Sequence, residues 1–256
     1  MTENQTVIHG APRYEYSADV MVHMCDDARI CRPADLMRFM QESATRQLEE
    51  LGPDAETLRA LGRAFILSRI SIDFPTPVRT FSRVRCTTWP CPSGRGAAFD
   101  RCFEIFDEQG AAAARAVSQW AFLDYRNHRL LRGEDMDLSF VRDEQVEVSL
   151  PLRFRIPKDA VLAQIGERRV CYSDIDTNRH MNNTRYCDLY CDFLPMAGAR
   201  VTALSVAFAK EALPGETITV LRAESPDTPG LFYFRTLCPD GSVNTEATVR
   251  LARIVS

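Results

Sequence analysis

The residues best suited to chemistry stand in one run of thirteen, Asp174-Ile-Asp-Thr-Asn-Arg-His-Met-Asn-Asn-Thr-Arg-Tyr186. The run holds two carboxylates, three amides and one of the four histidines of the chain. Apolar residues then recur at helical spacing up to Leu194, and Pro195 ends the pattern. A loop that enters a helix presents unpaired N–H groups and the positive end of the helix dipole to a developing oxyanion. The sequence therefore predicts a catalytic loop at the start of a helix.

A second, longer helix is predicted from Pro33 to Leu51. Proline suits a first helical turn, and Gly52-Pro53 is a strong stop signal. Between these limits one apolar stripe follows the spacing i, i+3, i+4, i+7. Its members are Leu36, Phe39, Met40, Ser43, Ala44, Leu48 and Leu51.

Strand-like segments surround both helices in the same order. Before the helices these are Tyr14–Val22 and Arg168–Tyr172. After them these are Phe65–Phe74, Arg83–Trp89, Ala98–Phe106 and Ala113–Asp124 in the first half, and Arg200–Ala209, Glu216–Ala223, Leu231–Leu237 and Asn244–Ile254 in the second. Local echoes support a repeat, with Leu67-Ser-Arg-Ile matched to Leu204-Ser-Val-Ala and Phe103–Gly110 matched to Phe234–Gly241.

A long helix wrapped by a curved antiparallel sheet is the arrangement called the hotdog fold. We therefore predict an α+β fold of two tandem hotdog units, paired as a pseudo-dimer with the site between them. The expected divisions are an N-terminal tail at 1–12, an N-terminal hotdog domain at 13–132, a linker at 133–167, and a C-terminal hotdog domain with the catalytic residues at 168–256.

Composition narrows the function and the compartment. A net charge of −4 gives no support for nucleic-acid binding, and no apolar run is long enough to span a bilayer. The first seven residues lack the pattern of a targeting segment, and an odd count of nine cysteines indicates reduced thiols. Cys187 and Cys191 have no partners that complete a metal set, so we expect packing roles for them, no metal and no cofactor. A cytoplasmic protein is expected.

Three segments resemble the acyl-acyl carrier protein thioesterases. The run Asp176-Thr-Asn-Arg-His-Met-Asn-Asn183, with Tyr186 after it, matches that family's pattern D-x-N-x-H-x-N-N before an aromatic residue. The run Lys210-Glu-Ala-Leu-Pro-Gly215 is similar to the family's strand end, where an acidic residue precedes a Leu-Pro-Gly turn. A weaker similarity lies in the first half, at Thr88-Trp89, Arg101 and the run Ser118-Gln-Trp120 that leads to Asp124. The resemblance covers most of residues 13–254. It implies two hotdog units and the release of free fatty acid from acyl carrier protein in fatty acid biosynthesis.

The resemblance also implies catalytic roles for Asp176, Asn178, His180 and Glu211. Without it, Asp176 could be a turn residue and Glu211 a solvated strand end. Ala212 stands where many plant members of the family carry a cysteine, so carboxylates and His180 must suffice here. Either carboxylate could activate a water, and direct attack by Asp176 to form an anhydride stays open.

Substrate contacts are expected from both halves. Asn182 and Asn183 could contact the substrate or cap the second helix, and both roles can coexist. The first half has no Asn-x-His equivalent and is expected to be chemically silent, which leaves Met37, Phe39 and Met40 free to form an acyl slot.

Other thioester functions remain open at this point. An acyl-CoA thioesterase would use the same groups, and a hotdog-type 3-hydroxyacyl thioester dehydratase also uses histidine and a carboxylate. A non-catalytic acyl-binding module would not need the polar cluster. Carrier-protein binding would need a basic patch, for which Arg126, Arg129 and Arg132 are candidates. Neither a membrane nor a nucleic acid is an expected partner, and a homodimer of pseudo-dimers is left open.

Overall fold

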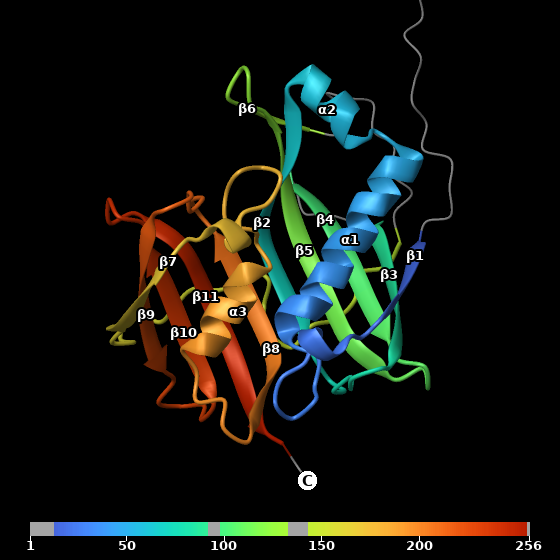
Figure 1. Ribbon diagram of the computed structural model, residues 1–256. Coiled ribbons are helices and arrows are strands. Elements are labelled where there is room, and N and C mark those ends of the chain that lie inside the picture. The colour runs from blue at the N-terminus through green and yellow to red at the C-terminus, as the bar shows by residue number, and fades with distance from the viewer. Residues whose placement is uncertain (1–12, 92–97, 133–142, 255–256) are drawn as a thin grey trace, which may run out of the picture.

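The computed structural model describes residues 13–91, 98–132 and 143–254. These residues form one antiparallel sheet of eleven strands in the order β1-β3-β4-β5-β2-β8-β11-β10-β9-β7, with β6 paired to β5. Helix α1 lies over the first five strands of this order and α3 over the last five (Figure 1). No helix in these ranges is long and apolar enough to cross a membrane.

Apart from α2 and β6, which occur in the first half alone among the described residues, the two halves repeat one order of elements, as predicted. The first half contains the 3-10 turn η1 (Val22–Met24), the helices α1 (Pro33–Leu51) and α2 (Ala55–Leu61), and the strands β1 (Tyr14–Asp19), β2 (Arg63–Asp73), β3 (Arg83–Cys91), β4 (Ala98–Phe106), β5 (Ala112–Asp124) and β6 (Arg129–Leu131). The second contains the 3-10 turn η3 (Tyr172–Asp174), the helix α3 (Arg185–Asp192), and the strands β7 (Ala163–Arg169), β8 (Ala199–Phe208), β9 (Thr217–Glu224), β10 (Leu231–Leu237) and β11 (Val243–Arg253).

Strands β2 and β8 join the halves at a seam where Ser71 lies opposite Ser205. The neighbouring pairings are the same on both sides of the seam, so these two serines are equivalent positions. The predicted match of Ser68 to Ser205 is therefore wrong. A shared Leu-Ser pair carries little information beside the register of the whole sheet.

The connection between the halves crosses the seam on the face away from the helices. Ser71 Oγ donates to the carbonyl of Leu150 at 2.7 Å, and Ser205 Oγ donates to the carbonyl of Pro151 at 2.9 Å. Because side chains alternate along a strand and Ile72 packs in the core, these hydroxyls point outward. Of the predicted linker at 133–167, residues 143–162 contain no helix or strand. The predicted tail and residues 133–142 lie outside the described ranges.

Three elements differ from the sequence-based prediction, and the first is β6, whose three residues were not predicted as a strand. Strand β7 begins at Ala163, inside the predicted linker, and the predicted strand at 168–172 ends in the turn η3. Strand β7 is an edge strand with only Ile165 as a large apolar residue, so it lacks the pattern of a buried strand. Helix α2 was not predicted, because its seven residues are too few to show periodicity. The Asp54 side chain caps it by accepting a bond from Thr57 N at 2.7 Å.

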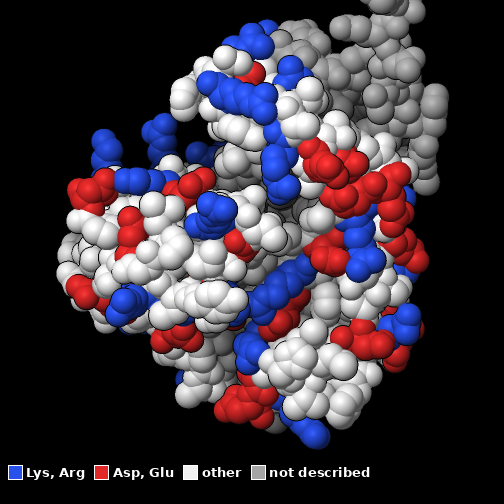
Figure 2. Space-filling view, turned by 45° about the horizontal axis from the view of Figure 1, so that its top comes forward, with Lys and Arg blue, Asp and Glu red and all other residues white. Residues whose placement is uncertain are grey.

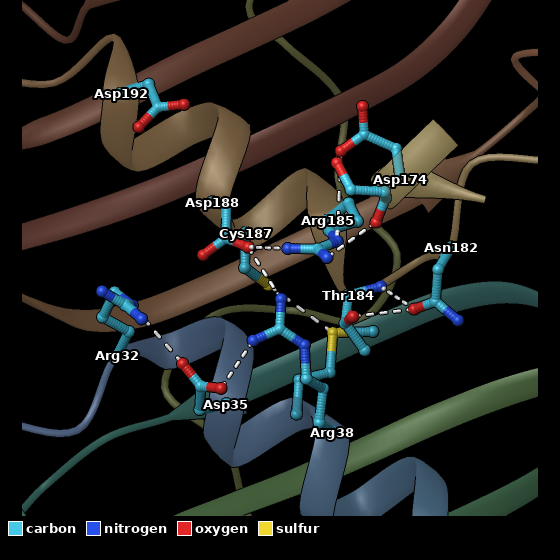
Figure 3. Close-up of polar contacts among 12 residues, drawn as sticks. Arg32, Asp35, Arg38, Asp174, Asn182, Thr184, Arg185, Cys187, Asp188 and Asp192 are labelled. Carbon is cyan, nitrogen blue, oxygen red and sulfur yellow. Dashed lines mark hydrogen bonds and ion pairs between the residues drawn. The ribbon is translucent and has the colours of Figure 1, made fainter. Parts of the chain in front are cut away.

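An ion-pair network ties α1 to α3 (Figure 3). Arg38 Nη1 lies 2.6 Å from Asp35 Oδ1 on its own helix, and Nη2 lies 2.8 Å from Asp188 Oδ2 on α3. Arg185 also reaches Asp188, at 3.4 Å. Burial opposes the charge of Arg38, but the two carboxylates outweigh it and hold its pKa above the ordinary value. The helices of the two halves are therefore joined by charge as well as by packing.

Replacing Arg38 with leucine should destabilise the protein, because it removes the main partner of the buried Asp35. Since the Arg38 side chain is 33% exposed, the expected loss is about 1–3 kcal/mol, below that of a fully buried pair. Urea unfolding measures this decrease in the free energy of unfolding. Arg83→Leu, which removes an exposed pair with Asp19, is the control and should cost much less. Equal losses in the two variants would show that the Arg38 network adds nothing beyond a surface pair.

Candidate active site

A tight loop after η3 carries the polar motif. Ile175 and Met181 form an isolated bridge, and within it Asp176 N donates to the carbonyl of His180 at 3.1 Å. Arg179 turns the chain with a left-handed φ of 67°, an uncommon conformation for a side chain of its size. The loop thus brings Asp176 and His180 to its two ends, side by side.

His180 lies between two carboxylates from different segments. Its Nδ1 is 3.9 Å from Asp176 Oδ1, and its Nε2 is 3.8 Å from Glu211 Oε1. Met181 N donates to the carbonyl of Ala212 at 2.9 Å, which fixes the loop against the segment that follows β8 and carries Glu211. Both carboxylate distances are longer than a hydrogen bond, as is common for catalytic groups before substrate binds.

The two carboxylates have different surroundings. Asp176 is 17% exposed, and it accepts hydrogen bonds from Asn178 N at 2.8 Å and from Asn182 Nδ2 at 3.2 Å. Glu211 is 60% exposed and accepts no hydrogen bond from any residue that the structure describes. Asp176 is therefore held in place, while Glu211 is free to bind a water.

Behind the motif, Asp174 and Asn182 form a supporting layer (Figure 3). The buried Asp174 carboxylate accepts bonds from Arg168 Nη2 at 2.8 Å and Cys171 N at 2.9 Å, and its carbonyl accepts one from Asn182 N at 2.8 Å. Asn182 Oδ1 accepts bonds from Thr184 N at 2.9 Å and Thr184 Oγ1 at 2.7 Å. Asn182 thus stabilises the turn into α3 and orients Asp176.

A cavity of about 1230 Å³ joins this site to the first half. Of the predicted site residues, the following line it: Asp176, Asn178, His180, Asn183, Glu211, Met37 and Met40. Asn182 and Phe39 do not. Phe39 is turned about 100° around the axis of α1 from Met40, and its side chain is buried in the core.

The first half keeps the loop without its chemistry. Cys25 and Cys31 form the equivalent bridge, Asp26 N donates to the carbonyl of Ile30 at 2.9 Å, and Arg29 has a left-handed φ of 62°. Ile30 stands where the second half has His180. That the first loop is chemically silent stays a prediction.

Family comparison decides what kind of protein this is. The sequence profile of the acyl-ACP thioesterase N-terminal domain matches residues 12–136, and that of the acyl-ACP thioesterase C-terminal domain matches residues 159–250. The chain belongs to the acyl-ACP thioesterase family. It is accordingly a thioester hydrolase, and the resemblance found in the sequence is confirmed.

Solved structures support the fold of this thioesterase. An acyl-ACP thioesterase from Bacteroides thetaiotaomicron is 20% identical with a TM-score of 0.83, over 94% of this chain and 98% of the other. The 12:0-ACP thioesterase from Umbellularia californica is 15% identical with a TM-score of 0.82, over 96% and 99%. A MaoC-like dehydratase from Phytophthora capsici is 13% identical with a TM-score of 0.62, over 99% and 100%. The predicted fold of two tandem hotdog units is confirmed. The chain matches no curated protein.

Sequence reasoning missed part of the cavity wall of the thioesterase. Leu58 of α2, and Arg63 and Phe65 at the start of β2, line the cavity beside α1. Because α2 is short and was not predicted, nothing in the sequence pointed to this corner. Gln47, which does not line the cavity but accepts a hydrogen bond from Arg101, was also missed, since a polar residue on the buried face of α1 lies outside the apolar stripe.

Alkylation of exposed thiols should leave the thioesterase active. Ala212 is buried where relatives carry cysteine, and Cys171 is the exposed thiol among the described residues. Cys238, whose Sγ lies 3.8 Å from the carbonyl of Glu211, is buried, and burial raises the pKa of its thiol. Iodoacetamide should therefore label Cys171 with turnover unchanged. Turnover that falls in step with labelling of one cysteine, in protein that remains folded, would indicate a thiol mechanism.

Proposed function

We propose that the protein hydrolyses acyl-acyl carrier protein in the cytoplasm and releases free fatty acid during fatty acid biosynthesis. The observation that carries the proposal is the position of His180, between Asp176 and Glu211 on the wall of a large cavity shared by both halves. A histidine between carboxylates can move protons, and the cavity can hold an acyl chain. Family membership supplies the thioester as the bond that is broken.

In the proposed reaction each polar side chain of the site has its own role. Glu211 takes a proton from a water, and the resulting hydroxide attacks the thioester carbonyl carbon. The Asn178 amide, which lines the cavity and makes no side-chain hydrogen bond to the described residues, donates to the oxyanion. The first N–H groups of α3 already donate to Asn182, Asn183 and Thr184, so the helix end supplies no further hydrogen bond. As the tetrahedral intermediate collapses, the C–S bond breaks and the leaving sulfur receives a proton through His180. Asp176 orients His180.

The experiment offers chain-matched acyl carrier protein and acyl-CoA thioesters and identifies the released acid. A higher kcat/KM with the carrier protein is expected, because the acidic carrier can be steered by basic side chains. The exposed Arg59, Arg126, Arg129 and Arg132 lie at the end formed by α2 and β6, where Lys and Arg side chains gather (Figure 2). Equal or better use of CoA would favour the acyl-CoA alternative, and an enoyl product would favour a dehydratase. Association into a homodimer of pseudo-dimers stays a prediction.

Trimming the cavity wall on α1 should change the length of the released acid. Met40 lines the cavity, so Met40→Ala should admit a longer chain. Each buried methylene is worth about 0.8 kcal/mol, so one added two-carbon unit would shift the preference on the order of tenfold. Gas chromatography of the released acids measures the distribution of their chain lengths. Phe39→Leu, a change next to the cavity wall but outside it, is the control; a product profile that changes in both variants or in neither would place the acyl slot elsewhere.

A further inference from the structure

A buried arginine faces the cavity without a carboxylate partner. Arg101 of β4 lines the cavity and is only 9% exposed. Its Nη1 donates to Gln47 Oε1 on α1 and to Thr88 Oγ1 on β3, the latter at 3.1 Å. Within the described ranges its Nε and Nη2 make no hydrogen bond, and no carboxylate forms an ion pair with it. The two hydrogen bonds of Nη1 therefore fix the guanidinium, and Nε and Nη2, which are not fully enclosed, remain available to a ligand in the cavity.

Among the described residues, no carboxylate lies within ion-pair distance of the Arg101 guanidinium, although the buried Asp100 lines the same cavity. The Ser118 hydroxyl beside it on β5 donates to the main-chain carbonyl of Arg101 at 3.2 Å, and Trp120 Nε1 donates to Ser118 Oγ at 2.7 Å. Burial lowers the pKa of Arg101 to about 10, so the side chain is still protonated near neutral pH. A buried, unpaired cation is costly in a folded protein, and such groups are often part of a binding site.

Arg101 is too far from the motif to take part in the hydrolysis. Strand β4 stands three places from β8 in the sheet, and Glu211 follows the end of β8. With neighbouring strands about 4.8 Å apart, the separation along the sheet is roughly 14 Å. A group bound at Arg101 therefore lies on the acyl chain, well away from the thioester carbonyl.

We propose that Arg101 binds an acceptor oxygen carried by the acyl chain itself, a hydroxyl or, most strongly, a carboxylate. The favoured substrate is then an oxygenated acyl thioester. A plain chain that reached Arg101 would displace water from Nε and Nη2 and leave both without an acceptor. A carboxylate would accept from both nitrogens at once. This inference rests on the proposed function, since it needs an acyl chain in this cavity.

Binding of free acids to the His180→Ala protein tests the proposal apart from catalysis. Calorimetry would compare plain monocarboxylic, ω-hydroxy and α,ω-dicarboxylic acids over a series of chain lengths. At the length that reaches Arg101, the diacid should bind on the order of 10- to 100-fold more tightly than the plain acid, the equivalent of a charge-assisted hydrogen bond. Adding Arg101→Leu should abolish the difference. Adding Arg153→Leu should keep it, because Arg153 is exposed and contacts Gln119 outside the cavity.

Two results would overturn the proposal. One is that neither oxygenated acid binds more tightly than the plain acid at any length. The other is that Arg101→Leu changes only the chain length of the plain acid that binds most tightly. The guanidinium would then limit the length of the cavity without binding the acid. If Arg101→Leu does not fold, Arg101→Lys replaces it, because lysine keeps the charge but lacks the two-nitrogen edge and should lose most of the preference. Failure of every acid to bind would instead refute the acyl cavity, and with it the proposed function.

Discussion

Replacing His180 with alanine is expected to lower kcat by about 10²–10⁴-fold, the usual loss when an acid–base group is removed. His180 is 16% exposed and lies within 4 Å of Asp176 and Glu211, and no other histidine lines the cavity within the described residues. No other imidazole can therefore replace it. The measurement is kcat at saturating acyl carrier protein thioester, with circular dichroism and thermal unfolding to show that the fold is intact.

The control for this variant is His128→Ala. His128 is exposed in the turn before β6, so its loss should leave kcat unchanged. If His180→Ala retains activity within a few-fold of the parent, His180 has no part in the proton transfers and the scheme proposed above is wrong.

Changing Glu211 to glutamine should reduce kcat about as much, by about 10²–10⁴-fold, whereas Asp176→Asn should have a smaller effect of roughly 10- to 100-fold. The difference follows from their surroundings. Glu211 has no hydrogen bond from the described residues and can hold the attacking water, while both oxygens of Asp176 already accept bonds. Asparagine would keep part of that bonding. Both variants are nearly isosteric with the parent, so kcat compares the two carboxylates directly.

The opposite order would change the mechanism. If Asp176→Asn is the more damaging variant by tenfold or more, Asp176 is the better candidate for direct attack. An acyl group found on Asp176 by mass spectrometry after rapid quenching would establish the anhydride route and remove Glu211 from the role of base.

The parts of the fold that could be predicted were those with strong local signals. Helix α1 begins at Pro33 and ends at Leu51, as the proline, the stripe and Gly52-Pro53 indicate. Strand β7 and helix α2 carry weak signals, because one is a polar edge strand and the other has two turns at most. Short elements of this kind are determined by the neighbours they pack against, which a local pattern does not contain.

The residues of the candidate site also divide into those with a strong local sequence signal and those without one. Residue types and spacing alone pointed to the loop at 174–186, because its members are close in the sequence. Glu211 became a candidate only through the family resemblance, since a lone acidic residue at a strand end has no distinctive pattern. Arg101 had no assigned role, because its anchors Gln47 and Thr88 come from two other elements and only the fold brings them together.

The seam between β2 and β8 makes the pairing of the two hotdog units an intramolecular event. Two separate units would come apart on dilution, and their cavity would exist only above a threshold concentration. Covalent attachment replaces that threshold with a fixed, high effective concentration of one unit beside the other. Covalent attachment also allows the two units to differ in sequence, because each unit is formed by its own part of the chain. The two loops differ in this way, with Ile30 in the first at the place of His180 in the second, so the proposed mechanism gives each protein molecule one reaction centre.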